Sequence, residues 1–143
     1  MALTPLSPAE VAYLESQPLG RLATIQPDGS PQVKPVGFRY NPELGTVDVT
    51  GFKMSASQKY RNVSRDGRAA LVIDDILSTQ PWRVRFLEIR GRAEAVPGDS
   101  DGDGDGPSDA SVIRLHPGRV LSFGIEEPPD EPHLTPLHSR TLA

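Results

Sequence analysis

The chain has 143 residues, of which 36% are hydrophobic, and this length predicts one domain, residues 1–143, with no room for a second core. The absence of cysteine excludes disulfide scaffolds and thiolate metal sites and fits a reducing, cytoplasmic setting. A net charge of −4 with dispersed basic residues argues against nucleic acid as a partner, and no apolar run approaches the ~20 residues of a membrane span.

The first predicted element is a short helix. Ser7 to Glu10 reads as a capping box, with Ser7 as N-cap, Pro8 at the first helical position and Glu10 placed to return a hydrogen bond. We expect this helix to reach about Ser16, because Gln17-Pro18 then ends it.

Two hairpins are predicted next. Leu22 to Ile25 is a short β-rich run, Pro27-Asp28-Gly29 supplies a turn, and Gln32 to Tyr40 alternates into a second strand. A second turn, Asn41 to Gly45, leads to the strand Thr46 to Thr50. The pattern then changes to helical spacing.

That helix is expected over Ser55 to Arg65, and Asp66-Gly67 turns the chain into the apolar run Arg68 to Ile73. A continuous apolar run suits a central strand that is buried on both faces. Trp82 to Val96 is a long alternating strand, in which Gly91 marks a bulge or bend.

The C-terminal third is less regular. The acidic, low-complexity segment 97–109 is expected to be a mobile loop, and its Asp-Gly repeats lack the glutamate of a calcium loop. Ser111 to Leu115 and Arg119 to Ile125 are expected as two strands joined by a turn at His116-Pro117-Gly118. Residues 127–143 form a tail without clear periodicity, which we expect to lie over a partner subunit.

The start of the helix at Ser55 to Lys59 is a candidate anion site. Hydroxyl and cationic side chains there accompany backbone N–H groups without intrahelical partners, and both favour a phosphate. The alternative is an ordinary capped helix with solvated side chains. No spacing of histidine and acidic residues indicates a metal site or a hydrolase triad, so no catalytic residue is assigned.

Several fragments carry a resemblance to a known family: LGRLATI, DGSPQVKPVGFRYNPELGTVDVTG, MSASQKYRNVSRDGRAALVIDD, PWRVRFLEIRGRAEA and IRLHPGRVLSFGIE. They resemble the pyridoxamine 5'-phosphate oxidase-like split β-barrel family, and within it the branch that uses the deazaflavin coenzyme F420. The most similar subgroup includes reductases of tetracycline biosynthesis, that is, of antibiotic biosynthesis. The resemblance implies a mainly β, antiparallel split β-barrel with a few peripheral helices, acting as a homodimer.

The resemblance also implies a cofactor site between two subunits. The phosphate-bearing side chain of the cofactor would lie at the helix start, and the strand before it would pass under the ring. Trp82 would close the site from the neighbouring subunit. The residues implied in cofactor binding are Gln32, Lys34, Pro35, Val36, Thr50, Gly51, Phe52, Ser57, Gln58, Lys59 and Trp82, with Lys53 and Arg61 as further cations.

The expected chemistry is hydride transfer from reduced F420 to a conjugated C=C bond or enone of a small, polycyclic molecule, which Phe52, Trp82 and Phe123 would hold by stacking. Tyr40, Tyr60, a histidine or solvent could supply the proton. Two alternatives stay open: an FMN-dependent enzyme of the same fold, and a carrier that binds F420 or a flavin without turnover. For the individual residues, the alternatives are an edge strand with an exposed lysine at Lys34, barrel filling by Phe52 and core packing by Trp82.

Overall fold

The computed structural model describes residues 6–98, 110–126 and 132–142. Its elements are, in chain order, α1 (Pro8–Ser16), β1 (Gly20–Ile25), β2 (Pro31–Asn41), β3 (Thr46–Thr50), the 3-10 helix η1 (Met54–Ala56), α2 (Gln58–Arg65), β4 (Arg68–Thr79), β5 (Trp82–Val96), β6 (Val112–Phe123), the 3-10 helix η2 (Pro132–Leu134) and β7 (Leu137–Thr141).

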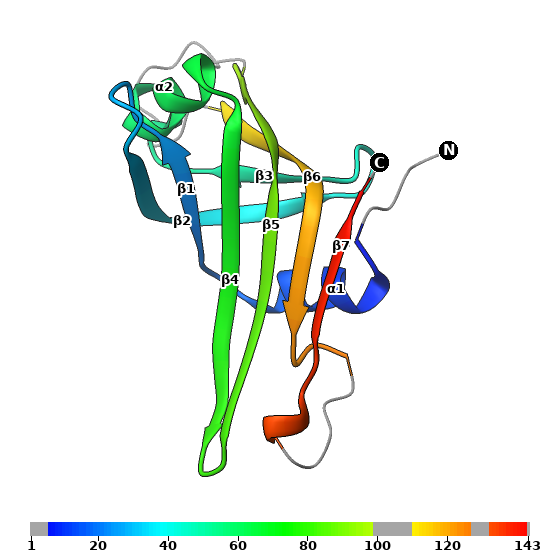
Figure 1. Ribbon diagram of the computed structural model, residues 1–143. Helices are drawn as coiled ribbons and strands as arrows, with labels where there is room; N and C mark the ends of the chain where they lie inside the picture. The colour runs from blue at the N-terminus through cyan, green and yellow to red at the C-terminus, as the bar shows by residue number, and fades with distance from the viewer. Residues whose placement is uncertain (1–5, 99–109, 127–131, 143) are drawn as a thin grey trace.

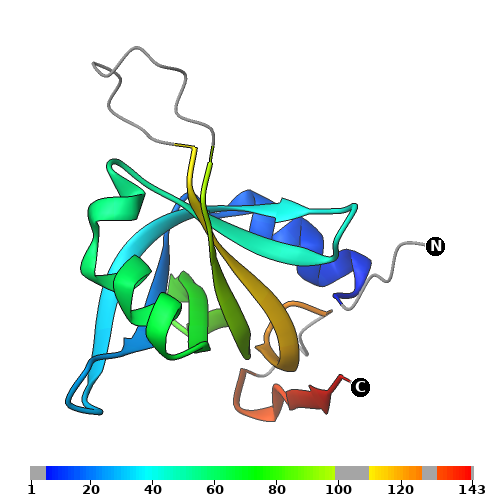
Figure 2. The ribbon, with the colours of Figure 1, turned by 90° about the horizontal axis from the view of Figure 1, so that it is seen from above.

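The strands form one antiparallel sheet in the order β3-β2-β1-β4-β5-β6-β7, and a further pairing of β3 with β6 closes the first six into a ring (Figure 1). Seen from above, α1 and α2 lie on different sides of this ring (Figure 2). The core inside it is aliphatic, with Leu22, Leu71, Ile89 and Leu115 fully buried. The predicted antiparallel split β-barrel with peripheral helices is confirmed.

Helix α1 begins as its sequence predicts. The Ser7 hydroxyl accepts a hydrogen bond from the Glu10 backbone N–H (3.2 Å), and the Ser7 N–H donates to Glu10 Oε1 (2.8 Å). Glu10 is buried and also pairs with Arg140 of β7. Burial raises the pKa of the Glu10 carboxyl, but the hydrogen bonds from Arg140 and Ser7 together lower it by more than burial raises it. The net shift of the pKa is therefore downward. The pair ties the two ends of the chain together.

The two predicted hairpins are also confirmed. β1 pairs with β2, and β2 pairs with β3, in antiparallel register. Gly29 has a φ of 85° and Gly45 a φ of 68°, a left-handed conformation that glycine adopts without steric cost. These two turns place β2 between β1 and β3.

A buried ion pair joins the two strands that close the ring. Asp48 of β3 has no exposed side-chain surface, and its carboxylate accepts hydrogen bonds from Arg114 of β6 at 3.1 and 3.2 Å. Asn41 (3.1 Å) and Thr46 (3.0 Å) donate to the same carboxylate. Burial raises the pKa of Asp48, but these hydrogen bonds lower it more, and the net shift is downward. Asp48 is therefore a satisfied buried charge.

The predicted turn at His116-Pro117-Gly118 is wrong, because β6 runs through it as one strand from Val112 to Phe123. The register shifts here: Arg90 of β5 pairs with Arg119 and Gly91 with Pro117, so Gly118 of β6 is the extra residue. The bulge expected at Gly91 therefore lies on β6, opposite Gly91. A Cβ at Gly91 would lie 1.9 Å from the His116 carbonyl oxygen, closer than any side chain allows. The bulge absorbs the irregular backbone that the sequence pattern indicates as a turn.

Two further boundaries need correction. The helix expected from Ser55 is split into η1 and α2, with Ser57 as the N-cap of α2. β4 continues to Thr79, and only Ala69, Leu71 and Ile73 along it are buried. It alternates between an inner and an outer face, so the expected burial on both faces is wrong, whereas its position between β1 and β5 is confirmed.

The described part of the tail is regular. β7 pairs with β6 of the same chain, with Val120 opposite Arg140, where we expected a segment lying over a partner. Residues 99–109 of the expected loop and 127–131 of the tail lie outside the described residues. Among the described helices, none has the length and apolar character needed to cross a membrane.

Replacing the buried carboxylate tests its role in closing the ring. The substitution Asp48→Asn leaves the largely buried Arg114 without its counter-charge, and we expect a loss of about 3 kcal/mol in the free energy of unfolding at pH 7, measured by urea denaturation. Because the pKa of Asp48 is lowered in the folded state, its stabilisation is present above about pH 4 and is lost as the pH falls through the folded-state pKa. The difference in the free energy of unfolding between wild type and variant should therefore become smaller at acidic pH.

Asp74→Asn is the matched control for this experiment, because Asp74 pairs with Arg21 on the surface, where both side chains are nearly half exposed. An exposed pair is worth at most about 1 kcal/mol. Equal losses for the two variants would contradict the role of Asp48 in ring closure.

Candidate functional site

Two lysines come together where β2 passes the start of α2. Lys34 lies on β2 and is exposed, and Lys59 lies in the first turn of α2 and is half-buried. The pKa of Lys59 is lowered, first by burial and second by the positive charge of Lys34. The two charges are therefore close enough to repel each other.

Within the described residues, neither lysine forms an ion pair with a carboxylate. Two neighbouring cations without a counter-charge, beside the positive end of a helix, form a site of positive potential. An anion bound between them would relieve the repulsion and replace the water that Lys59 loses on burial. The structure brings together the two lysines that the sequence analysis named separately.

The polar side chains at the start of α2 form hydrogen bonds within the chain. The Ser57 hydroxyl donates to the Met54 carbonyl (2.6 Å) and accepts from the Tyr60 N–H (3.3 Å), so it is a helix cap. Gln58 donates to Asn62 (2.7 Å) and accepts from Arg61 (2.9 Å). Lys59 is thus the side chain in this turn that is best placed to receive an anion.

Sequence reasoning missed the contact that holds α2 in place. Asn62 is fully buried, and its amide donates to the Thr24 hydroxyl of β1 (3.1 Å), which is also buried. Its Oδ1 accepts a hydrogen bond from Gln58 within α2, so Asn62 links the first turn of the helix to β1. A polar residue at the position of Asn62, one position before the buried Val63, was the available signal for this anchor.

The candidate residues of β2 divide between its two faces. Gln32 lies opposite Thr24, and Lys34 lies opposite Leu22, so both share the face that α2 covers. Val36 continues this face and is buried in the core. Pro35 lies on the other, outer face. Gln32 Oε1 is buried and has no hydrogen-bond donor in the described part of the chain, so it is an acceptor without a partner.

The next candidate residues lie at the end of β3 and in the turn that follows it. Thr50 pairs with Gly37 of β2, and Phe52 is 65% exposed, with the Lys53 ammonium 5.5 Å from its ring centre. Lys53 has a φ of 49°, a strained value for a lysine. A Cβ on Gly51 would lie 3.3 Å from the Met54 methyl group, so the backbone packs tightly here. Phe52 therefore faces solvent and does not fill the barrel, which was the alternative to a contact with the cofactor.

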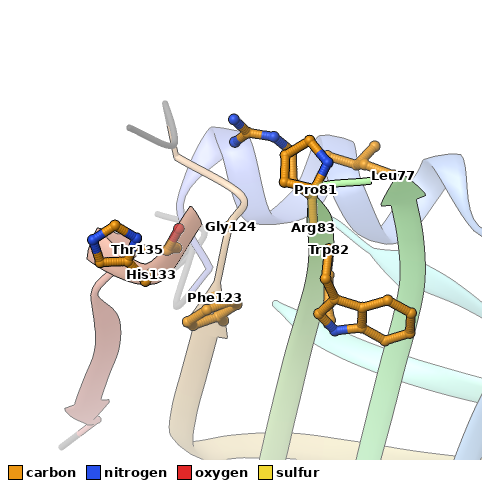
Figure 3. A pocket seen from close by; sticks show the side chains of 9 residues that line it. Leu77, Pro81, Trp82, Arg83, Phe123, Gly124, His133 and Thr135 are labelled. Carbon is orange, nitrogen blue, oxygen red and sulfur yellow. The ribbon is translucent and has the colours of Figure 1, made fainter. Parts of the chain in front are cut away.

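Trp82 lies at the opposite end of the molecule. It is 60% exposed at the tip of the β4–β5 hairpin, which projects beyond the other strands (Figure 1). β4 begins directly after α2 and has 12 residues, so roughly 35 Å of strand separates Trp82 from Lys59 of the same chain. Trp82 therefore does not pack in the core. Within one chain, Trp82 and Phe123 line the same cavity, and Phe52 is not part of its lining (Figure 3).

Comparisons with known proteins agree with this geometry. The family profile described as "Pyridoxamine 5'-phosphate oxidase" matches residues 6–123, which include the whole ring of strands. A solved structure titled "F420 Reductase" superposes with a TM-score of 0.57 and 28% identity, over 76% of this chain and 93% of that chain.

Two curated relatives are reductases by name. The chain is 41% identical over 122 residues to the 5a,11a-dehydrotetracycline/5a,11a-dehydrooxytetracycline reductase of Streptomyces rimosus, which covers 85% of each chain. It is 37% identical over 100 residues to the F420H(2)-dependent biliverdin reductase of Mycobacterium tuberculosis, over 68% of this chain and 64% of the relative.

Proposed function

The chain belongs to the pyridoxamine 5'-phosphate oxidase family, and from this membership we propose that it is an F420-dependent reductase. The observation that carries the reductase activity is the 41% identity, over 85% of both chains, to a protein named as a dehydrotetracycline reductase. Dependence on F420 is supported by the similarity to the F420H(2)-dependent biliverdin reductase and to the structure titled "F420 Reductase". We propose that its substrate is a small polycyclic molecule with a conjugated C=C bond or enone. The names of the two relatives give a dehydrotetracycline and biliverdin as their substrates.

The residues at the start of α2 fit an anionic cofactor. Lys34 and Lys59 offer two cations that repel each other in the absence of an anion, and a phosphate is the group that a helix N-terminus with such cations favours. Gln32 Oε1 offers a buried acceptor without a donor on the same face of β2. The donor set therefore suits a ring system that carries N–H groups and a phosphate-bearing side chain.

In this proposal Lys34 and Lys59 hold the phosphate, and Gln32 orients the ring beside β2. When bound, reduced F420 supplies the hydride. The chain itself binds, orients and excludes water, and the anchor from Asn62 to Thr24 keeps Lys59 in place relative to Lys34. No side chain is assigned as proton donor. Tyr40 was one candidate for this role. Its hydroxyl is buried, and burial is the main cause of its raised pKa.

We also propose that the protein acts as a homodimer. Trp82 lies too far from Lys59 of its own chain to close that site, so a second copy must supply any aromatic residue of this kind. The outer face of the sheet offers a surface for pairing: Val33, Ala23 and Ala70 lie opposite one another on β2, β1 and β4. Val33 is 62% exposed, and a cavity of about 440 Å³ adjoins it on β1 and β4. Such an exposed apolar face is typical of an interface.

The reaction is tested with reduced F420 that carries deuterium at the position of the transferred hydride. We expect anaerobic incubation with a panel of polycyclic enones to place deuterium on a product carbon, detected by mass spectrometry. Reduced FMN should give a slower reaction at equal concentration. Faster turnover with FMN would favour the flavin alternative. Tight binding of F420 without oxidation by any acceptor would favour a carrier.

Lys59→Ala tests the anion site. Loss of one charge-assisted hydrogen bond, worth about 1.5–3 kcal/mol, should weaken F420 binding about 10- to 150-fold, measured by fluorescence titration. Without cofactor, the variant should unfold at the same or a higher temperature, because a repulsion has been removed. Arg65→Ala, at the far end of α2, is the control that should keep wild-type affinity. An unchanged dissociation constant for Lys59→Ala would remove Lys59 from the site.

The dimer is tested by light scattering after gel filtration, where we expect twice the chain mass of 15.5 kDa. Val33→Glu should shift the protein towards monomer and weaken F420 binding in parallel, because it places a charge on the outer apolar face. Leu44→Glu, at an exposed leucine in the turn between β2 and β3, should leave the dimer intact. A wild-type monomer that binds F420 would contradict the intersubunit site.

A further inference from the structure

The β4–β5 hairpin leaves the sheet as a two-stranded arm, residues 75–85, which projects past the other strands (Figure 1). β1 pairs with β4 only as far as Val72, and β6 pairs with β5 only as far as Phe86. Beyond these pairs, no third strand of the described chain supports the arm, and Trp82 at its tip is 60% exposed. A hairpin of two strands is marginally stable by itself, so the contacts at its base decide its direction.

A cluster of polar side chains holds this base. Asp75 of β4 and Arg85 of β5 lie opposite each other as the first cross-strand pair of the arm. Arg85 donates to both oxygens of the Asp75 carboxylate, at 3.0 and 2.7 Å, which is the strong two-fold geometry of this kind of pair. The Tyr13 hydroxyl of α1 donates to Asp75 Oδ1 at 2.9 Å, and Gln17 donates to Oδ2 at 3.4 Å. One carboxylate therefore joins both strands of the arm to α1.

The cluster is well packed and keeps its charges near neutral pH. Tyr13 is buried, and the guanidinium carbon of Arg85 lies 4.8 Å from the centre of its ring, a cation–π contact. Burial, followed by the hydrogen bond to Asp75, raises the pKa of Tyr13, so the phenol keeps its proton. The hydrogen bonds from Arg85 are the main cause of the lowered pKa of Asp75, so the carboxylate stays charged.

Helix α1 is itself fixed to the body of the sheet. Glu10, one turn before Tyr13, is buried and pairs with Arg140 of β7. Leu14, the residue after Tyr13, is fully buried in the core. Because the helix has these separate anchors, the contact between Tyr13 and Asp75 refers the direction of the arm to the sheet and not to the helix alone.

We propose that Tyr13, Asp75 and Arg85 are positioning residues, which fix the angle between the arm and the sheet and thereby the place where Trp82 meets the partner subunit. This inference rests on the proposed dimer, in which the hairpin end of one copy lies at the α2 end of the other. Trp82 is three positions from Arg85 along β5, so about 10 Å of strand acts as a lever. A tilt of about 10° at the base would move the indole by about 2 Å over this length, a large displacement for a preorganised site.

Trp82 is the only tryptophan of the chain, so time-resolved anisotropy of its fluorescence reports on the tip of the arm without any ligand. Asp75→Ala removes the acceptor that Tyr13 and Arg85 share. We expect the fraction of the anisotropy that is lost in a fast, nanosecond component to rise at least about twofold in this variant. The dissociation constant for F420, measured by titration, should rise about tenfold. A role in stability alone would leave both readouts of the folded protein unchanged.

Two further variants make the test specific. Asp74→Ala, one position earlier on β4, makes the same change where the carboxylate pairs with Arg21 on the outer face, and it should leave both readouts unchanged. Tyr13→Phe keeps the buried ring and removes only the hydroxyl, so it carries the test if Asp75→Ala does not fold. It should loosen the arm in the same direction, with little additional effect in the Asp75→Ala background, because the hydroxyl has then already lost its charged acceptor.

An anisotropy decay that is unchanged in the folded variants would show that other contacts direct the arm, and would overturn the proposal. A looser arm with unchanged affinity for F420 would overturn it as well, because the position of the arm would then not matter to the site. If the wild type binds no F420, the proposed function fails, and the anisotropy still decides whether the cluster directs the arm.

Discussion

The pairing of β3 with β6 is the constraint on which the rest of the structure depends. β3 has only five residues, and it closes the ring through the buried contact between Asp48 and Arg114. With β3 fixed against β6, β2 is held between two paired neighbours, and its alternation decides which side chains meet α2. A buried carboxylate is a costly way to join two strands, but its four hydrogen bonds require one register, since a slip would leave the charge unpaired.

The lengths of β4 and β5 keep the cationic site and the aromatic cavity apart. These strands have 12 and 15 residues and extend beyond the ring, so the cationic site lies at one end and the aromatic cavity at the other. One chain therefore presents Lys34 and Lys59 far from Trp82. A symmetric pair of chains would be able to bring the hairpin end of one copy to the α2 end of the other, which is the arrangement that the proposed dimer uses.

Features set by local interactions could be predicted from the sequence. The capping box at Ser7, the turns at Gly29 and Gly45 and the alternation from Trp82 to Val96 depend on neighbouring residues, and each is present. Features set by distant pairing could not. His116-Pro117-Gly118 has the composition of a turn, yet a bulge at Gly118, opposite Gly91 of β5, allows β6 to continue as one strand. Similarly, β7 is a strand because β6 offers it an edge, and the tail sequence alone lacks a clear strand pattern. For the site, lysines and a helix start were recognisable, whereas the role of Ser57 as a cap and the anchor from Asn62 to Thr24 required the fold.

The lysine pair connects stability with function. Holding Lys59 partly buried near Lys34 raises the free energy of the folded chain, as the lowered pKa of Lys59 records. This unfavourable contribution is tolerated because α2 is fixed by other contacts, above all the buried hydrogen bond from Asn62 to Thr24. An anion that binds between the two ammonium groups removes the repulsion without any rearrangement of the helix. Its binding therefore does not have to order the site first. Such preorganisation is what a reductase needs if the cofactor provides the hydride and the protein provides its position.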